Sequence, residues 1–65
     1  MKVMVNDEEL DIDSDTTVST LLDSLGFPDR GIAVAVNWTV LPRSQWDCAV
    51  PEGARVEVVT AVQGG

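Results

Sequence analysis

The sequence predicts a two-layer α+β domain, in which one short helix packs against a mixed β-sheet. Three observations support this class: a length of 65 residues, a hydrophobic content of 45%, and one helical stripe among several short β-prone segments. A chain this short forms one domain, because about 60 residues bury only about 60% of the surface that the unfolded chain exposes. We expect this domain to span residues 1–62 and a flexible Gly-Gly tail to follow at residues 63–65.

The N-terminal segments predict a β-hairpin. Residues 2–5 and 9–12 alternate between polar and apolar side chains. Asn6-Asp7 lies between these segments and is typical of a tight turn. We therefore expect the first two strands to pair with each other.

The residues after this hairpin predict a helix. Thr17 stands at the N-cap position, and Gly26 stands just beyond the last turn, where a left-handed conformation is common. Pro28 prevents the helix from continuing. At about nine residues the helix is too short to be stable alone, so packing against the sheet must hold it. Its apolar stripe consists of Val18, Leu21, Leu22 and Leu25.

The second half of the chain supplies the other strands, predicted at residues 32–36, 39–41 and 55–62. On the last strand, Val56 and Val58 are expected to face the helix. A first hairpin, a helical crossover and a final strand beside the first strand give a β-grasp arrangement. Between the last two strands, Trp46 is interpreted as a packing residue, since so small a domain needs large buried side chains.

The charge is strongly negative. Eleven Asp and Glu residues stand against four Lys and Arg residues, which gives a formal net charge of -7. A nucleic acid or an anionic membrane would repel such a surface, because both bind mainly basic side chains. Either the acidity favours a protein partner with a basic docking face, or it serves solubility alone.

Cys48 is the only cysteine, so no internal disulfide forms, and a reducing cytoplasm is the expected location. The chain shows neither a signal peptide nor an apolar run long enough to span a bilayer. With no histidine in the sequence, Cys-His catalysis is excluded, and Cys48 is interpreted as a small, semi-buried hydrophobic residue.

The sequence ends in Gln63-Gly64-Gly65, which has the chemistry of a narrow reactive tail. Glycines present no side chain, so such a segment fits a channel that would exclude other residues. A carboxylate at its end reacts with nucleophiles only after activation, for example as an acyl-adenylate. The chain contains no Gly-rich phosphate-binding loop, so a partner would have to supply the nucleotide site. The alternative is a frayed terminus with no function.

Several stretches of the sequence resemble the ThiS family, the sulfur-carrier proteins of thiamine biosynthesis. These stretches are Thr17-Val18, Leu21-Leu22, residues 33–37, residues 42–46 and residues 56–65. The resemblance covers nearly the whole length, and the motifs occur in the family's order. Asn6-Asp7 departs from the family, in which Asn-Gly is more usual at the first turn.

The resemblance implies a ubiquitin-like β-grasp fold and a role for the last two residues. An E1-like adenylyltransferase would use ATP to adenylate Gly65, and a persulfide donor would convert it to a thiocarboxylate. Thiazole synthase would then take the sulfur. Gly64 would allow the tail to thread into these enzymes. The chain itself would bind no cofactor and no metal, and it would act as a carrier and not as an enzyme.

A docking surface is predicted on the sheet face opposite the helix. Met4, Val59 and Ala61 are expected to form an apolar patch there, together with Ala33 and Ala35. Three alternative functions stay open at this stage. They are a small subunit resembling that of molybdopterin synthase, a ubiquitin-like modifier conjugated through Gly65, and a plain interaction module.

Overall fold

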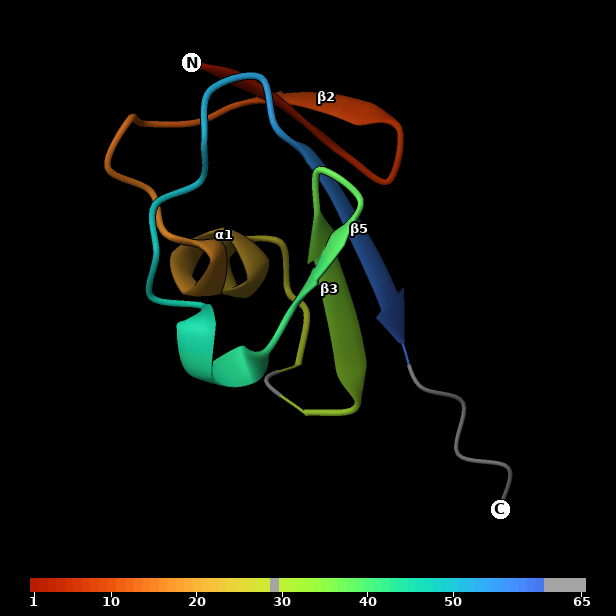
Figure 1. Ribbon diagram of the computed structural model, residues 1–65. Coiled ribbons are helices and arrows are strands. Elements are labelled where there is room, and N and C mark those ends of the chain that lie inside the picture. Colours follow the sequence, from red (N-terminus) through yellow and green to blue (C-terminus); the bar gives the residue numbers. More distant parts are fainter. Residues whose placement is uncertain (29, 61–65) are drawn as a thin grey trace.

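Figure 1 shows a computed structural model of the chain, which describes residues 1–28 and 30–60. One helix packs against one face of a five-stranded sheet with the strand order β2-β1-β5-β3-β4. The predicted two-layer α+β class and β-grasp arrangement are therefore confirmed. The elements are β1 (Lys2–Val5), β2 (Glu8–Asp11), α1 (Val18–Ser24), β3 (Ile32–Val36), β4 (Thr39–Leu41), the 3-10 turn η1 (Arg43–Gln45) and β5 (Arg55–Thr60).

The last strand is the centre of the sheet. β5 pairs in parallel with β1 on one side, with Val5 opposite Val56. On the other side it pairs with β3 in antiparallel register, from Val36 opposite Val56 to Ile32 opposite Thr60. β2 and β4 are antiparallel edge strands, each joined to its neighbour by a hairpin. As predicted, the final strand lies beside the first.

Both hairpins turn through two residues with positive φ. The values are 49° and 69° at Asn6 and Asp7, and 51° and 72° at Asn37 and Trp38. Two consecutive positive values define a type I′ turn, whose twist matches that of the flanking strands. Asn and Asp tolerate this conformation better than most residues, whereas a tryptophan is unusual there.

The helix begins and ends at the residues that the sequence predicts. The Thr17 Oγ1 atom accepts a hydrogen bond of 3.1 Å from the Thr20 amide, and the Thr20 Oγ1 atom accepts one of 3.0 Å from the Thr17 amide. At the other end, Gly26 has a φ of 82°, and the Phe27 amide donates back to the Leu22 carbonyl. This is a Schellman ending, which satisfies carbonyls that the helix leaves open.

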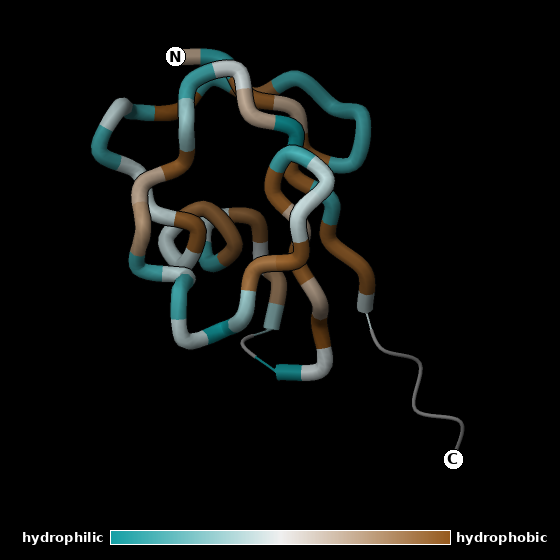
Figure 2. The backbone as a smooth tube through the Cα atoms, viewed as in Figure 1, coloured by the Kyte–Doolittle hydropathy of each residue, from teal (hydrophilic) through white to brown (hydrophobic). Residues whose placement is uncertain are grey.

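The core lies between the helix and the sheet face that points towards it. In Figure 2, the helix and the strands beside it are both largely brown, the colour of hydrophobic residues. Val56 is fully buried and Val58 is 7% exposed, so the predicted inward face of β5 is confirmed. Trp46 is also 7% exposed, and its Nε1 atom donates to the Leu41 carbonyl. The other buried apolar residues are Val3, Val5, Val18, Leu21, Leu22, Val34, Val50 and Ala54.

The segment after η1 closes the open end of this core. The Val18 and Ser19 amides, in the first turn of α1, donate to the Cys48 and Trp46 carbonyls. The loop thereby satisfies helix donors that have no partner within the helix. Cys48 itself is exposed, so its interpretation as a semi-buried residue is wrong. Its carbonyl faces the helix, and this backbone contact leaves the side chain outside.

We predict that Leu21→Ala costs about 2–5 kcal/mol of unfolding free energy, because it leaves a cavity beneath the helix. A domain of this size has a total stability of only about 3–10 kcal/mol, so most of the variant should unfold on mild heating. Leu25→Ala is the matched control, since Leu25 lies on the same helix and is 40% exposed. Thermal and urea unfolding measure the loss of unfolding free energy. Equal losses for the Leu21 and Leu25 variants would contradict the proposed core.

Candidate functional site

The structure positions the strand that leads to the predicted site. Gly64 and Gly65, and Ala61 of the predicted docking patch, lie outside the described residues. β5 is described up to Thr60 and is the strand from which the chain continues to these glycines. The described part of the site therefore consists of β5 and the exposed face of the sheet.

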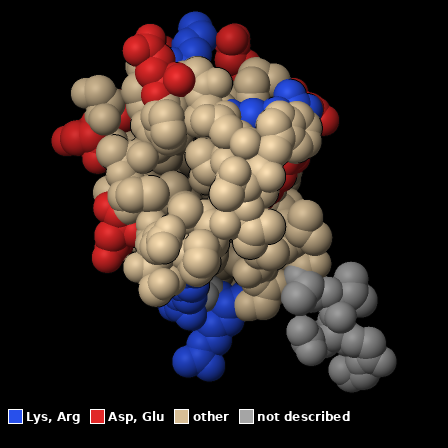
Figure 3. Space-filling model, viewed as in Figure 1, with Lys and Arg blue, Asp and Glu red and all other residues tan. Residues whose placement is uncertain are grey.

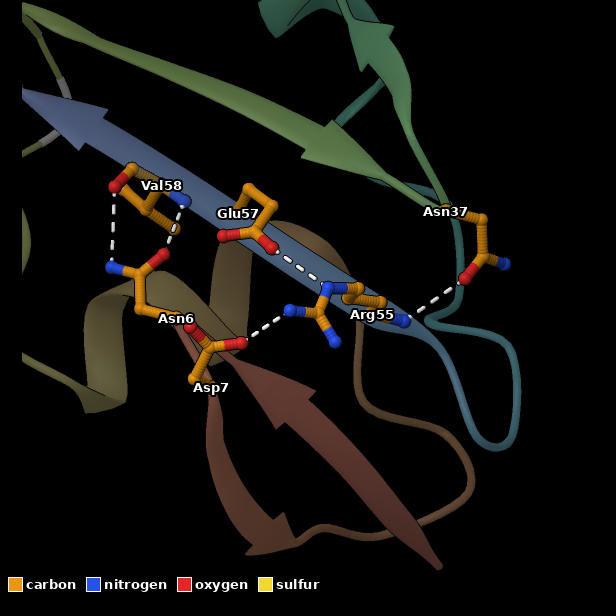
Figure 4. Close-up of polar contacts among 6 residues, drawn as sticks. All are labelled: Asn6, Asp7, Asn37, Arg55, Glu57 and Val58. Carbon is orange, nitrogen blue, oxygen red and sulfur yellow. Dashed lines mark hydrogen bonds and ion pairs between the residues drawn. The ribbon is translucent and has the colours of Figure 1, made fainter.

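Asn6 fixes β5 at the point where β1 turns away (Figure 4). Its side-chain Oδ1 atom accepts a hydrogen bond of 2.8 Å from the Val58 amide, and its Nδ2 atom donates to the Val58 carbonyl at 3.2 Å. The Asn6 amide also donates to the Val56 carbonyl. The side-chain amide thus takes the place of the next peptide group of β1, and extends the parallel pairing by one step.

Arg55 links the two hairpin turns across the start of β5 (Figure 4). Its guanidinium pairs with Asp7 in the first turn and with Glu57 two residues further along β5, the latter at 2.9 Å. Its backbone amide donates to the Oδ1 atom of Asn37 in the second turn. Its guanidinium carbon also lies 4.9 Å from the centre of the Trp38 ring.

Strand register decides which side chains share the sheet face that points away from the helix. Val59 is 64% exposed on this face, as predicted, whereas Met4 is half-buried with Arg55 and Glu9 opposite it on the neighbouring strands. Val40 is 71% exposed and lies opposite Ala35. The uncharged members of the face are Met4, Ala33, Ala35, Val40 and Val59. The exposed apolar surface is therefore centred on β3, β4 and the end of β5.

Sequence reasoning missed Val40 and Trp38 on this surface. Residues 39–41 form a strand of three residues, which is too short for alternation to show which side chain faces outward. Pairing with β3 decides it, because Val36 is opposite Thr39 and packs towards the core. The turn residue Trp38 is 73% exposed. Its positive φ could not be read from its residue type.

In Figure 3, acidic side chains lie at the top of the molecule, where basic side chains stand among them, and along its left side. Asp11 belongs to the β2 edge and lies 3.1 Å from the N-terminal ammonium. A hydrogen bond from this ammonium, its charge and that of Lys2 together lower the pKa of Asp11. The carboxylate is therefore ionised near neutral pH, and its charge is offset by the ammonium and by Lys2 beside it.

Within residues 1–28 and 30–60, no group of three His, Cys, Asp or Glu side chains is arranged to hold a metal ion. A hollow of about 300 Å³ lies between the first hairpin and the end of α1, lined by Val5, Asn6, Glu8, Leu10, Leu25 and Phe27. In this described part, no helix is long and apolar enough to cross a membrane.

A family model described as "ThiS family" matches residues 2–65. The chain belongs to the ThiS family. It is 30% identical to the sulfur carrier protein ThiS of Escherichia coli (strain K12), with all of both chains covered. It is also 36% identical to a thiazole synthase of Paramagnetospirillum magneticum, but it spans only 20% of that protein. Solved structures agree with the family.

The crystal structure of a thiamine biosynthesis protein (ThiS) from Geobacter metallireducens matches with a TM-score of 0.82 and 29% identity, over 100% of both chains. A solution structure of a thiamine biosynthesis protein from the same organism matches with a TM-score of 0.77 and 29% identity, over 100% of this chain and 88% of that one. The resemblance inferred from the sequence is confirmed, and so is the predicted function of a sulfur carrier in thiamine biosynthesis. These relatives are named for thiazole or thiamine biosynthesis, so they give no support to the alternative of a molybdopterin-synthase small subunit.

We predict that Asn6→Gly destabilises the domain by about 1–2 kcal/mol, because it removes two hydrogen bonds to Val58. Glycine accepts the positive φ of this position, so the turn itself should persist. The measurements are urea unfolding and hydrogen exchange of the Val58 amide, which should become faster. Asp7→Gly is the control in the same turn, and it should leave this exchange unchanged. Equal protection of Val58 in both variants would contradict the role of Asn6.

Proposed function

We propose that the chain carries sulfur on the carbonyl carbon of Gly65 and delivers it to an enzyme that builds the thiazole ring. The family match carries this proposal, because it extends over residues 2–65 and so includes both glycines as well as the folded domain. Gly64 provides a narrow approach to a partner's active site, since glycine has no side chain. The chain would serve as a co-substrate of its enzymes and not as an enzyme.

Activation would come from an E1-like adenylyltransferase. A carboxylate oxygen of Gly65 attacks the α-phosphorus of ATP, and pyrophosphate leaves. The terminal sulfur of a persulfide then attacks the carbonyl carbon, and AMP leaves. The resulting acyl disulfide is cleaved by a thiolate that attacks the donor's sulfur, which releases the thiocarboxylate. The partner would bind the ATP, and the carrier itself would bind no cofactor.

The folded body would act as the handle that positions this tail. β5 is paired on both sides and anchored by Asn6, so the direction in which the chain leaves the domain is fixed up to Val58. A rigid handle turns a loose encounter into a positioned reaction, which is a large part of what binding contributes to catalysis. Activation needs ATP, and the persulfide donor needs a reducing environment, so both steps favour a cytoplasmic location.

The sheet face opposite the helix would dock on these enzymes. Val59 lies on this face near the described end of β5, and Met4 contributes from β1. Ala61, the third residue proposed for this contact, lies outside the described residues. Thiazole synthase is one expected partner, because a thiazole synthase chain contains a segment similar to the whole of this protein. The adenylyltransferase is the other.

We predict that deletion of Gly65, or addition of one alanine after it, lowers sulfur transfer by at least about 100-fold. The reason is that either change moves the carboxylate out of register with the reacting groups. The measurement is thiocarboxylate formation by tail-fragment mass spectrometry, with adenylyltransferase, ATP and a sulfur donor present. Full activity of the extended chain would refute the proposal. A lysine-linked conjugate in place of the thiocarboxylate would instead identify a ubiquitin-like modifier.

We predict that Val59→Asp weakens binding to the adenylyltransferase by about 10-fold, because it buries a carboxylate in an apolar contact. Val59 is exposed, so the thermal unfolding midpoint should change little. Ser19→Asp adds the same charge on the exposed surface of α1 and is the control. Equal affinities of the two variants in titration calorimetry would exclude this face as the docking surface.

A further inference from the structure

Trp38 occupies a position that favours residues with small or no side chains. Its φ is 72°, and it is the second residue of a two-residue type I′ turn, where glycine fits best. The indole is nevertheless 73% exposed, so burial in the core does not explain it. An unusual backbone conformation that is kept without a packing reason points to a function of the side chain.

The exposed indole is held in place by Arg55. The guanidinium carbon lies 4.9 Å from the ring centre, which is the geometry of a cation–π contact. Arg55 is itself fixed by ion pairs with Asp7 and Glu57 (Figure 4). A side chain that is already ordered loses less freedom when it binds, so the indole is preorganised for a partner.

The surroundings of Trp38 identify the kind of surface that would cover it. On the same sheet face, Val40 is 71% exposed and continues the apolar surface towards Val59. Asp7 and Glu57 border it, and with the single positive charge of Arg55 between them they leave one net negative charge. A complementary surface therefore combines an apolar slot with Lys or Arg side chains at its edge.

We infer that Trp38 is the anchor of a docking site for thiazole synthase, which receives the indole in an apolar slot bordered by basic side chains. This inference rests on the proposed function, and it adds which part of the chain contacts the thiazole synthase. Exposed aromatic side chains that enter a pocket are the residues that dominate binding energy at protein interfaces. A thiazole synthase chain that contains a segment similar to this whole protein favours that enzyme as the occupant.

The test compares Trp38→Gly with Asp7→Gly, using the full chain and the thiazole synthase of the same genome. Both variants place glycine at the same position of a type I′ turn, and both remove one neighbour of Arg55. Calorimetric titration should show about 30-fold weaker binding for Trp38→Gly and a smaller loss, of about 5-fold, for Asp7→Gly, which removes one charge at the border of the surface and keeps the indole. Trp38→Phe should recover part of the loss.

Fluorescence gives a second readout. Trp46 is buried, so acrylamide should quench mainly Trp38 in the free protein, and the complex should protect it. Unchanged quenching, or equal affinities of wild type and Trp38→Gly, would overturn the inference while leaving sulfur transfer through Gly65 intact. A wild-type dimer that Trp38→Gly abolishes in sedimentation would assign the indole to self-association and overturn it as well. Failure of wild type to bind thiazole synthase and to acquire sulfur would instead defeat the proposed function.

Discussion

The burial of β5 between two strands and beneath the helix is the constraint on which the rest of the structure depends. Val56 and Val58 fill the centre of the core, and among the described strands β5 is the one that pairs with both β1 and β3. Such a short chain has little apolar area to spare, so the domain depends on the buried side chains of its central strand. The same strand leads to the predicted sulfur-carrying residue, which links the stability of the domain to the presentation of its tail.

Two asparagine side chains add hydrogen bonds to β5 beyond those that the backbones of its neighbours make. Asn6 bonds Val58 beyond the end of β1, and Asn37 accepts from the Arg55 amide at the other edge of β5. In both hairpins the asparagine also has a positive φ, which it tolerates better than most residues. Each asparagine thus both forms a turn and bonds a neighbouring strand. In a domain this small, one residue performs two structural roles.

The outer face of the sheet combines exposed apolar side chains with fixed charges. Its apolar side chains are mostly small or isolated, and charged residues separate them from the β2 edge. Arg55 pairs with two carboxylates, which leaves one net negative charge in the cluster, and it also contacts an indole, so one side chain organises both the charge and the shape of this region. The proposed recognition by a basic partner would then depend on a few positioned groups and not on a large hydrophobic area.

By itself, the sequence determined the helix and its caps, the five strands, the inward face of β5 and the family. These follow from local patterns: the spacing of Val18, Leu21 and Leu22, the cap residues Thr17 and Gly26, and the diglycine ending. Only the tertiary structure decided that Asn6 bonds Val58, that Val40 faces outward, and that Cys48 is exposed. The physical reason is that these features depend on register and on contacts between segments far apart in the chain, which a local pattern does not contain.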